Sequence, residues 1–359
     1  MSSKLRNLRQ GYASLTPPQY MNFPTDQPFT DVQTFVLNSI LLDGHLQRYP
    51  PSDFYQRSFW KWIISQLEAL IGDEDYEVDE RLYERQISLL SVTRRTQDLA
   101  GSSPPPPSYV THFWENRSQG APLEGLAEYG SVTLFESQTT IESGTTGLRT
   151  WRASFVLAQF LIDHPDTVRG HRVLELGSGA GFLGLVIACL QQQDGQGGRR
   201  SGLCLTDVNE VVLQRCAQNV NLPCNVSASL PHLDVRPLDW SDAVCPNLEP
   251  STRKSLSGLD ADTIVAADML YHPDIITPFL TTLRLALLSE SKLNTKTAYL
   301  ALTVRNQELL DAFLHASTDI FHLCVEDISS RASGHQSSFL ESERIDTENV
   351  MVIQVTADT

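Results

Sequence analysis

The residues best suited to binding chemistry form a glycine-rich segment, Glu175-Leu-Gly-Ser-Gly-Ala-Gly181. It continues an apolar run at 172–176 that predicts a buried strand, and it precedes an apolar run at 182–190 that predicts a helix. Glycines in such a turn let the backbone approach a ligand, and free N–H groups at the helix start favour an anionic group. The dinucleotide fingerprint fails because Phe182 takes its last glycine position. A turn that is glycine-rich by chance is the alternative interpretation.

The spacing Glu175-x-Gly177-x-Gly179-x-Gly181 resembles motif I of S-adenosylmethionine-dependent methyltransferases. Three later segments end predicted strands in polar or aromatic residues: Leu205-Thr-Asp207, Leu238-Asp-Trp240 and Ala267-Asp-Met-Leu-Tyr271. Ligands of open parallel sheets bind outside the carboxyl ends of the strands. The four segments are therefore expected to meet at one site.

Each of these side chains has a chemistry that suits such a cofactor. The Asp207 carboxylate can accept hydrogen bonds from both ribose hydroxyls, and the Trp240 indole can stack on adenine. The small Ala267 side chain lets the cofactor approach the backbone closely. An aspartate at a strand end is also a common helix cap, and a tryptophan is often a core residue. The cofactor interpretation therefore depends on the segments lying together.

Asp268 and Tyr271 are the candidates for chemistry on an amine. A lysine nucleophile must lose its proton, because its pKa of about 10.4 leaves it mostly charged. A carboxylate and a phenol hydroxyl can hold the amine, and the aromatic ring favours a cation. His272 is an alternative base, and a helix cap before Pro273 is the structural alternative for Asp268.

The elements that must position these residues alternate between strand and helix from about residue 131, which is typical of a parallel α/β sheet. The predicted strands of this sheet are 172–176, 202–206, 234–238, 263–267, 297–304, 320–326 and 349–356. A strand at 131–136 and a helix at 148–162 precede them. We expect the last two strands to pair antiparallel and the stretch 241–259 to be irregular.

The N-terminal third predicts a different organisation. Residues 1–29 are polar, contain prolines and show no clear period, and part of this stretch is expected to form a loose arm. Apolar residues at helical spacing predict helices near residues 32–40, 56–71 and 81–92. A stiff linker is predicted at 101–108, which contains four consecutive prolines. The expected domains are therefore 1–105, mainly helical with the linker, and 106–359.

The acidic stretch at residues 73–84 has two interpretations: a solvated face, or a docking patch for a basic partner. In the second case the N-terminal helices would dock the substrate protein.

Composition restricts the function classes. The chain has 359 residues and a net charge of −16, which argues against stable, nonspecific binding to nucleic acid. No apolar run is long enough to span a bilayer, and the N-terminus lacks the apolar segment of a signal peptide. The six cysteines include no Cys-x-x-Cys pair, so we expect no metal site and a reduced, cytoplasmic environment. A monomer is expected.

Together the four segments resemble the family 16 seven-β-strand protein methyltransferases, whose hallmark is an acidic residue, two variable positions and an aromatic residue after strand four. Residues 143–151, Ser-Gly-Thr-Thr-Gly-Leu-Arg-Thr-Trp, resemble a segment of the elongation factor 2 lysine methyltransferases. The resemblance implies an α/β fold with a seven-stranded Rossmann-like methyltransferase sheet and an N-terminal mainly helical extension. It also implies methyl transfer from S-adenosylmethionine to a lysine of elongation factor 2 in the cytoplasm.

Carried over by position, the resemblance assigns cofactor binding to Trp151, Glu175, Gly177, Ser178, Gly179, Asp207, Trp240 and Ala267, and catalysis to Asp268 and Tyr271. The alternatives are a methyltransferase for another protein, a small molecule or a nucleic-acid base, and a binding module that has lost activity. Amine-methylating nucleic-acid enzymes tend to have Asn/Asp-Pro-Pro-Tyr here, whereas Met269 and Leu270 stand in place of the prolines. Substrate contacts from loops 191–201 and 241–259 are left open.

Overall fold

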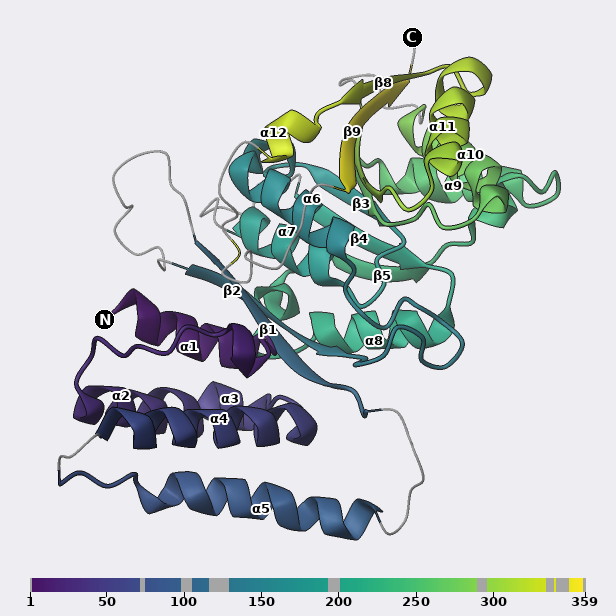
Figure 1. Ribbon diagram of the computed structural model, residues 1–359. Helices are drawn as coiled ribbons and strands as arrows, with labels where there is room; N and C mark the ends of the chain where they lie inside the picture. The colour runs from purple at the N-terminus through teal and green to yellow at the C-terminus, as the bar shows by residue number, and fades with distance from the viewer. Residues whose placement is uncertain are drawn as a thin grey trace. The chain divides into compact units, whose positions relative to one another are not determined.

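The structure, a computed structural model, describes residues 2–71, 75–97, 105–115, 129–192, 201–288, 296–333, 339 and 349–357 (Figure 1). The chain forms two compact units. The first comprises Met1–Trp114, Thr133–Thr140 and Phe339–Glu341, and the second comprises Glu115–Val132, Ile141–Ser338 and Ser342–Thr359. The division into functional domains at residue 105 stays a prediction, and residues 101–104 of the expected linker lie outside the described residues.

The second unit is built on the predicted seven-stranded sheet, which the structure confirms. Its strand order is β5-β4-β3-β6-β7-β9-β8. The strands are β3 (Arg172–Leu176), β4 (Gly202–Asp207), β5 (Leu233–Pro237), β6 (Thr263–Ala267), β7 (Thr297–Thr303), β8 (Leu323–Asp327) and β9 (Val350–Ala357). The first five pair in parallel, and β9 is antiparallel to both β7 and β8, as expected for the last two strands.

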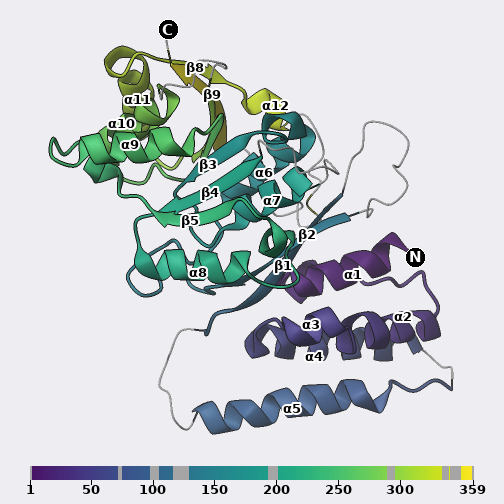
Figure 2. The same ribbon diagram turned by 180° about the vertical axis from the view of Figure 1, so that it is seen from behind.

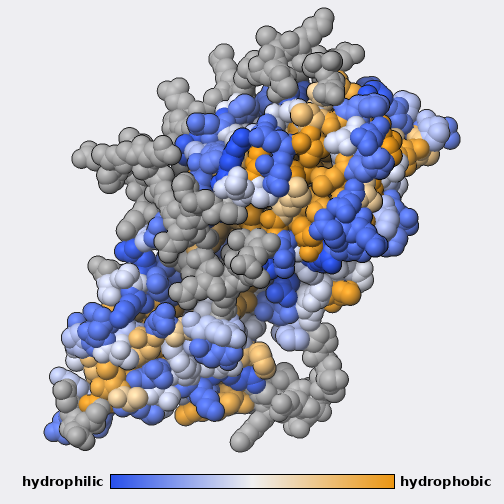
Figure 3. Space-filling model, turned by 45° about the horizontal axis from the view of Figure 1, so that its top comes forward, coloured by the Kyte–Doolittle hydropathy of each residue, from blue (hydrophilic) through white to orange (hydrophobic). Residues whose placement is uncertain are grey.

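Helices cover both faces of this sheet because the strands β3, β4 and β6 are buried over most of their length. One face carries α6 (Arg152–Asp163), α7 (Phe182–Gln192) and α8 (Glu210–Val220), and the other carries α9 (Glu249–Leu259), α10 (Ile276–Leu287) and α11 (Gln307–His315), as Figures 1 and 2 show. Buried Ile264, Leu280 and Leu300 belong to the core of the second face. Figure 3 shows apolar residues gathered in the middle of this unit's surface and hydrophilic ones around them.

The strand order determines where a ligand can bind. From β3 the chain moves through β4 to β5 on one side, whereas β6 and β7 lie on the other side of β3. The crossover direction therefore reverses between β3 and β6, and the loops that leave their carboxyl ends diverge. Such a switch point opens a crevice in doubly wound sheets.

The expectation of an irregular stretch at 241–259 was wrong for its second half, which is helix α9. Thr252 and Leu256, one turn apart, are buried, and α9 packs on α10. Its C-cap Asp260 adopts a left-handed φ of 46°, which ends the helix. Two buried residues among serines and charged residues do not give a helical periodicity that can be recognised in the sequence.

The first unit is mainly helical, as predicted. It contains α1 (Ser3–Ala13), α2 (Phe29–Val36), α3 (Gly44–Arg48), α4 (Asp53–Ile71) and α5 (Glu80–Gln97). The apolar residues predicted at helical spacing in 56–71 lie in the core of this unit: Phe59, Trp60, Ile63 and Leu67 are almost completely buried. Asp73 and Glu74 of the acidic stretch lie outside the described residues.

Helix α1 occupies the first part of residues 1–29, a stretch in which the sequence showed no clear period. Leu5, Leu8 and Tyr12 of α1 are buried at spacings of three and four residues. The Tyr12 ring lies 4.5 Å from that of Phe59, and the Tyr55 hydroxyl donates to the Thr16 carbonyl at 2.7 Å. Aromatic packing against α4 thus orders a segment whose polar composition conceals its apolar face.

β1 (Ser108–Glu115) and β2 (Tyr129–Glu136) form a separate two-stranded sheet. The sequence predicted only part of β2 and no β1. Among the described residues, no helix is both long and apolar enough to cross a membrane.

Candidate active site

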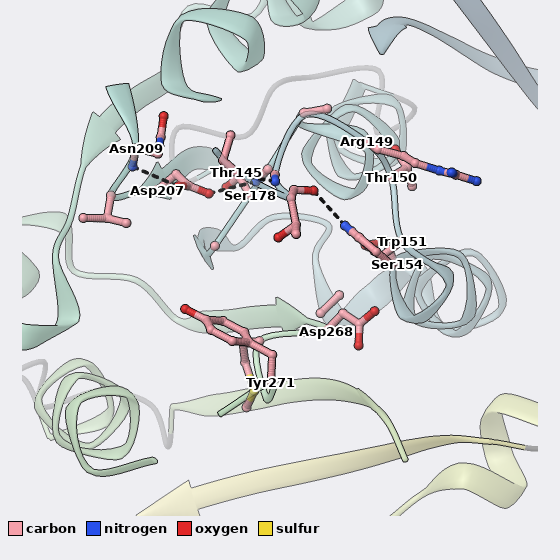
Figure 4. A pocket seen from close by; sticks show the side chains of 18 of the residues that line it. Thr145, Arg149, Thr150, Trp151, Ser154, Ser178, Asp207, Asn209, Asp268 and Tyr271 are labelled. Carbon is pink, nitrogen blue, oxygen red and sulfur yellow. Dashed lines mark hydrogen bonds between the residues drawn. The ribbon is translucent and has the colours of Figure 1, made fainter. Parts of the chain in front are cut away.

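A cavity of about 510 Å³ lies at the carboxyl ends of β3, β4, β5 and β6 (Figure 4). This size is within the range of small-molecule sites, roughly 300–1,000 Å³. Nine of the ten residues predicted for the site line it: Trp151, Gly177, Ser178, Gly179, Asp207, Trp240, Ala267, Asp268 and Tyr271. The tenth, Glu175, does not. The structure therefore brings the four segments together, although the role of each residue stays a prediction.

The glycine turn closes tightly on the segment that precedes α6. Gly177 and Gly179 have φ angles of +75° and +52°, which side chains rarely adopt. A Cβ on Gly179 would lie 3.1 Å from the carbonyl oxygen of Gly147. The Gly177 and Ser178 N–H groups both donate to the Thr206 carbonyl, at 2.9 and 2.8 Å. The turn is thus held to the end of β4 and cannot move independently of it.

Asp207 is fixed by backbone donors and does not cap the following helix. The Gly179 N–H donates to its Oδ2 at 3.2 Å, and the Asn209 N–H donates to its Oδ1 at 3.1 Å. Asn209 caps α8 instead, by accepting from Val211 and Val212. Burial raises the pKa of Asp207, and the N–H groups around it act in the opposite direction. The helix-cap alternative is therefore not what this carboxylate does.

Glu175 lies behind the glycine turn and not in the wall of the cavity. Its side chain is buried, and burial raises its pKa to about 8, although Ser178 and the Gly184 N–H oppose the shift. The nearby Asp207 charge acts in the same direction as burial. A Cβ on Gly184 would lie 2.9 Å from its Oε2, so α7 presses on the carboxyl group. Direct contact between Glu175 and a ligand stays a prediction that this geometry does not favour.

Trp240 begins a 3₁₀ turn, Trp240–Ala243, directly after β5. Its ring packs edge-on against Phe279 at 5.0 Å, and its outer edge approaches within 3.5 Å of a Cβ position on Gly177. The ring is therefore partly a core side chain and partly a cavity wall. Asp239 caps the turn, because its Oδ1 accepts from the Ser241 N–H at 2.8 Å.

Asp268 is the most strained of the predicted residues. Its φ of +57° is left-handed, which costs a non-glycine residue about 1 kcal/mol or more. The side chain is only 5% exposed. Its Oδ1 has no hydrogen-bond partner among the described residues, and its Oδ2 accepts from Arg305 Nη2 at 2.8 Å. Strain together with an unpaired buried oxygen is typical of a functional carboxylate.

Asp268 is likewise not a helix cap. The cap before Pro273 is His272, whose Nδ1 accepts from the Asp274 N–H at 3.3 Å. His272 does not line the cavity, so the geometry does not support it as the alternative base. Tyr271 lines the cavity and is 67% exposed, and Figure 4 shows it on the side of Asp268, across from Asp207.

Arg305 is the site residue that the sequence analysis missed. It follows β7, the strand next to β6, and it lines the cavity. Its guanidinium carbon lies 5.4 Å from the centre of the Trp151 ring, whose Nε1 donates to the Thr146 carbonyl at 2.9 Å. The only signal in the sequence was an arginine just past the carboxyl end of a central strand.

Comparisons with known proteins agree with this geometry. A family model described as lysine methyltransferase matches residues 132–316, more than half of the chain. The chain is a member of this lysine methyltransferase family. Human protein-lysine N-methyltransferase EEF2KMT is 32% identical over 273 residues, covering 74% of this chain and 70% of that protein. EFM3 from Chaetomium thermophilum is 27% identical over 302 residues, covering 83% and 82%.

The protein is therefore an S-adenosylmethionine-dependent protein-lysine methyltransferase. The residues present fit that cofactor: a carboxylate held at the end of β4, an aromatic edge over the glycine turn, and a cavity of suitable size. Opposite the held carboxylate, Asp268 offers an unpaired oxygen to a second group. The arrangement can hold one ligand against β3 and β4 and an amine against the loop after β6.

Proposed function

We propose that this cytoplasmic enzyme methylates a lysine of translation elongation factor 2 in the cavity described above. The observation that carries the proposal is the meeting of Asp207, Trp240 and Asp268 in one cavity. The substrate is supported by the resemblance of residues 143–151 to the elongation factor 2 enzymes. It is also supported by the similarity to the EEF2KMT proteins of human, cattle and mouse, which are 29–32% identical.

The cofactor half of the cavity is assigned to the ends of β3, β4 and β5. Asp207 accepts the ribose hydroxyls, because its oxygens keep acceptor capacity beyond the N–H groups of Gly179 and Asn209. The Trp240 edge flanks the adenine. Ser178 of the glycine turn, Trp151 and Ala267 complete the wall of the cavity. When bound, S-adenosylmethionine supplies an electrophilic methyl group on a sulfonium.

The acceptor half is assigned to Asp268 and Tyr271. The unpaired Oδ1 of Asp268 accepts a hydrogen bond from the lysine amine, and the Tyr271 hydroxyl and ring hold its other side. These groups position the nitrogen for in-line attack, which is the main contribution that a protein makes to such a displacement. Because a free lysine has a pKa of about 10.4, the site must also favour its neutral form.

Incubation of the purified chain with labelled S-adenosylmethionine and elongation factor 2 tests the proposal. The wild type should transfer label to one lysine, located by mass spectrometry, and Asp268→Ala should abolish transfer while S-adenosylmethionine still binds by calorimetry. Asp274→Ala is the matched control, because its side chain is 91% exposed and lies outside the cavity. Retained transfer in the Asp268 variant would refute the role assigned to it.

The substrate itself needs a separate measurement. Elongation factor 2 from cells that lack this chain should lose methylation at one lysine, as seen by mass spectrometry of the intact protein. Unchanged methylation would exclude elongation factor 2 as the substrate and leave the family assignment intact.

A further inference from the structure

The Asp268 carboxylate is paired on one side only. Arg305 Nη2 donates to Oδ2 at 2.8 Å, while the buried Oδ1 has no partner among the described residues. The Arg305 guanidinium is itself held over the Trp151 ring at 5.4 Å. Trp151 in turn donates to the Thr146 carbonyl. A continuous set of contacts therefore fixes Arg305, and with it the one oxygen that is left for an incoming group.

The charged groups of the cavity differ in how near they are to Asp268. The titratable side chains that line the cavity are Arg149, Asp207, Asp239, Asp268, Tyr271 and Arg305. Asp207 is held by the glycine turn and Asp239 caps the turn after β5, so each has backbone partners. Within the described part of the chain, the Arg305 guanidinium is the cation bonded to Asp268.

We propose that Arg305 is a positioning residue that offsets the charge of Asp268 so that the lysine enters the site as a neutral amine. The inference rests on the proposed function of the cavity. An uncompensated carboxylate would favour the ammonium form and raise the lysine pKa, because opposite charges stabilise each other. A carboxylate already paired with a guanidinium accepts a hydrogen bond from the amine without this penalty.

The proton and electron balance follows from this arrangement. The lysine ammonium first releases a proton to water. The lone pair of the neutral amine then forms the new N–C bond as the C–S bond breaks, which gives a positively charged methylammonium and a neutral thioether; the methylammonium can later release a proton to water. An ammonium has no lone pair and cannot attack. A lower pKa of the bound amine therefore raises the fraction of enzyme–substrate complex that can react at neutral pH.

The pH dependence of kcat for methylation of elongation factor 2, measured at saturating substrate between about pH 7 and 10, tests the proposal, because kcat reports the pKa values of the enzyme–substrate complex. Arg305→Gln should move the midpoint of the rising limb upward by about one pH unit, so that its rate deficit shrinks at high pH. The shift is modest because the Arg305 side chain is 47% exposed. Arg305→Lys keeps the charge and should restore most of the midpoint.

A second variant separates this role from the loss of any surface ion pair. Arg331→Gln removes an ion pair outside the cavity, in which Arg331 Nη2 lies 2.7 Å from Glu326 Oε1 and the Arg331 side chain is 51% exposed. It should leave the midpoint unchanged. An Arg305→Gln enzyme whose rate falls equally at every pH, or an Arg305→Lys enzyme that behaves the same way, would show that Arg305 is merely structural.

A binding measurement tests the same charge without turnover. S-adenosylmethionine is cationic at sulfur and S-adenosylhomocysteine is not. The ratio of their Kd values therefore depends on the electrostatic potential at the sulfur position. Arg305→Gln should increase the preference for the cationic form about three- to tenfold, which corresponds to roughly one pKa unit or less. An unchanged ratio would overturn the proposal for Arg305. If elongation factor 2 is not methylated at all, the substrate proposal fails while this ratio still decides the role of Arg305.

Discussion

The buried Glu175 carboxyl makes the stability of this enzyme depend on pH in an unusual direction. Its pKa is about 8 in the folded chain, compared with an ordinary value of 4.5. Between these values the unfolded chain releases the proton and the folded chain keeps it. Stability is therefore highest below the unfolded pKa, and it falls as pH rises through the folded pKa. Most exposed carboxylates, by contrast, make the free energy of unfolding depend little on pH between about 4.5 and 8.

The size of the effect follows from the same two numbers. One pKa unit corresponds to about 1.4 kcal/mol, and the full difference is worth about 5 kcal/mol. Between pH 6 and 8.5, linkage gives a loss of about 2–3 kcal/mol from this group. Glu175→Gln is a neutral isostere of the protonated acid and cannot ionise. It should therefore remove that loss and be the more stable protein at pH 8.5.

Urea unfolding at several pH values between 6 and 8.5, followed by tryptophan fluorescence, measures the difference between the two proteins. Glu210→Gln is the matched control, because Glu210 is an exposed carboxylate in the same unit. Parallel stability curves for wild type and Glu175→Gln would refute the reasoning. At pH 7 the variant should also bind S-adenosylmethionine within about twofold of wild type, since the wild-type side chain is already neutral.

Two further predictions concern the wall of the cavity. Asp207→Asn should weaken S-adenosylmethionine binding about tenfold or more in calorimetry, because it removes charge-assisted acceptance from the ribose; an affinity near wild type would exclude that contact. Gly179→Ala should destabilise the fold by about 1–2 kcal/mol in thermal unfolding, because its Cβ meets the Gly147 carbonyl at 3.1 Å and its φ is +52°. The Gly258→Ala control, which meets nothing within 4 Å, should not do so.

Much of the catalytic unit could be predicted because its strands are short apolar runs between clear turns. β3 and β6 have the predicted bounds. Asp207 ends β4 and Asp268 follows β6, and both lie at the same edge of the sheet because the carboxyl ends of parallel strands meet there. α1 and α9 could not be predicted as easily. α1 buries Leu5, Leu8, Tyr12 and Ala13 in a polar segment, whereas α9 buries only Thr252 and Leu256, so the apolar period of each helix is weak in the sequence.

Arg305 shows the limit of the same method within the site. Its importance comes from two contacts, with Asp268 and with the Trp151 ring, and both partners are far from it in the chain. No local pattern distinguishes it from an arginine on the surface. Glu175 shows the opposite case, because the sequence motif marks it strongly while the fold places it behind the turn.

The sequence left one question open for both aspartates, namely whether each is a helix cap or a site residue, and the answer lies in the neighbouring side chains. Asn209 caps α8 and His272 caps the turn at Pro273, so neither Asp207 nor Asp268 is needed for that purpose. The Asp268 carboxylate is buried, its backbone is left-handed, and its Oδ1 has no hydrogen-bond partner within the described part of the chain, all of which cost free energy. Such a cost is consistent with a group that completes its hydrogen bonds only when the substrate amine arrives.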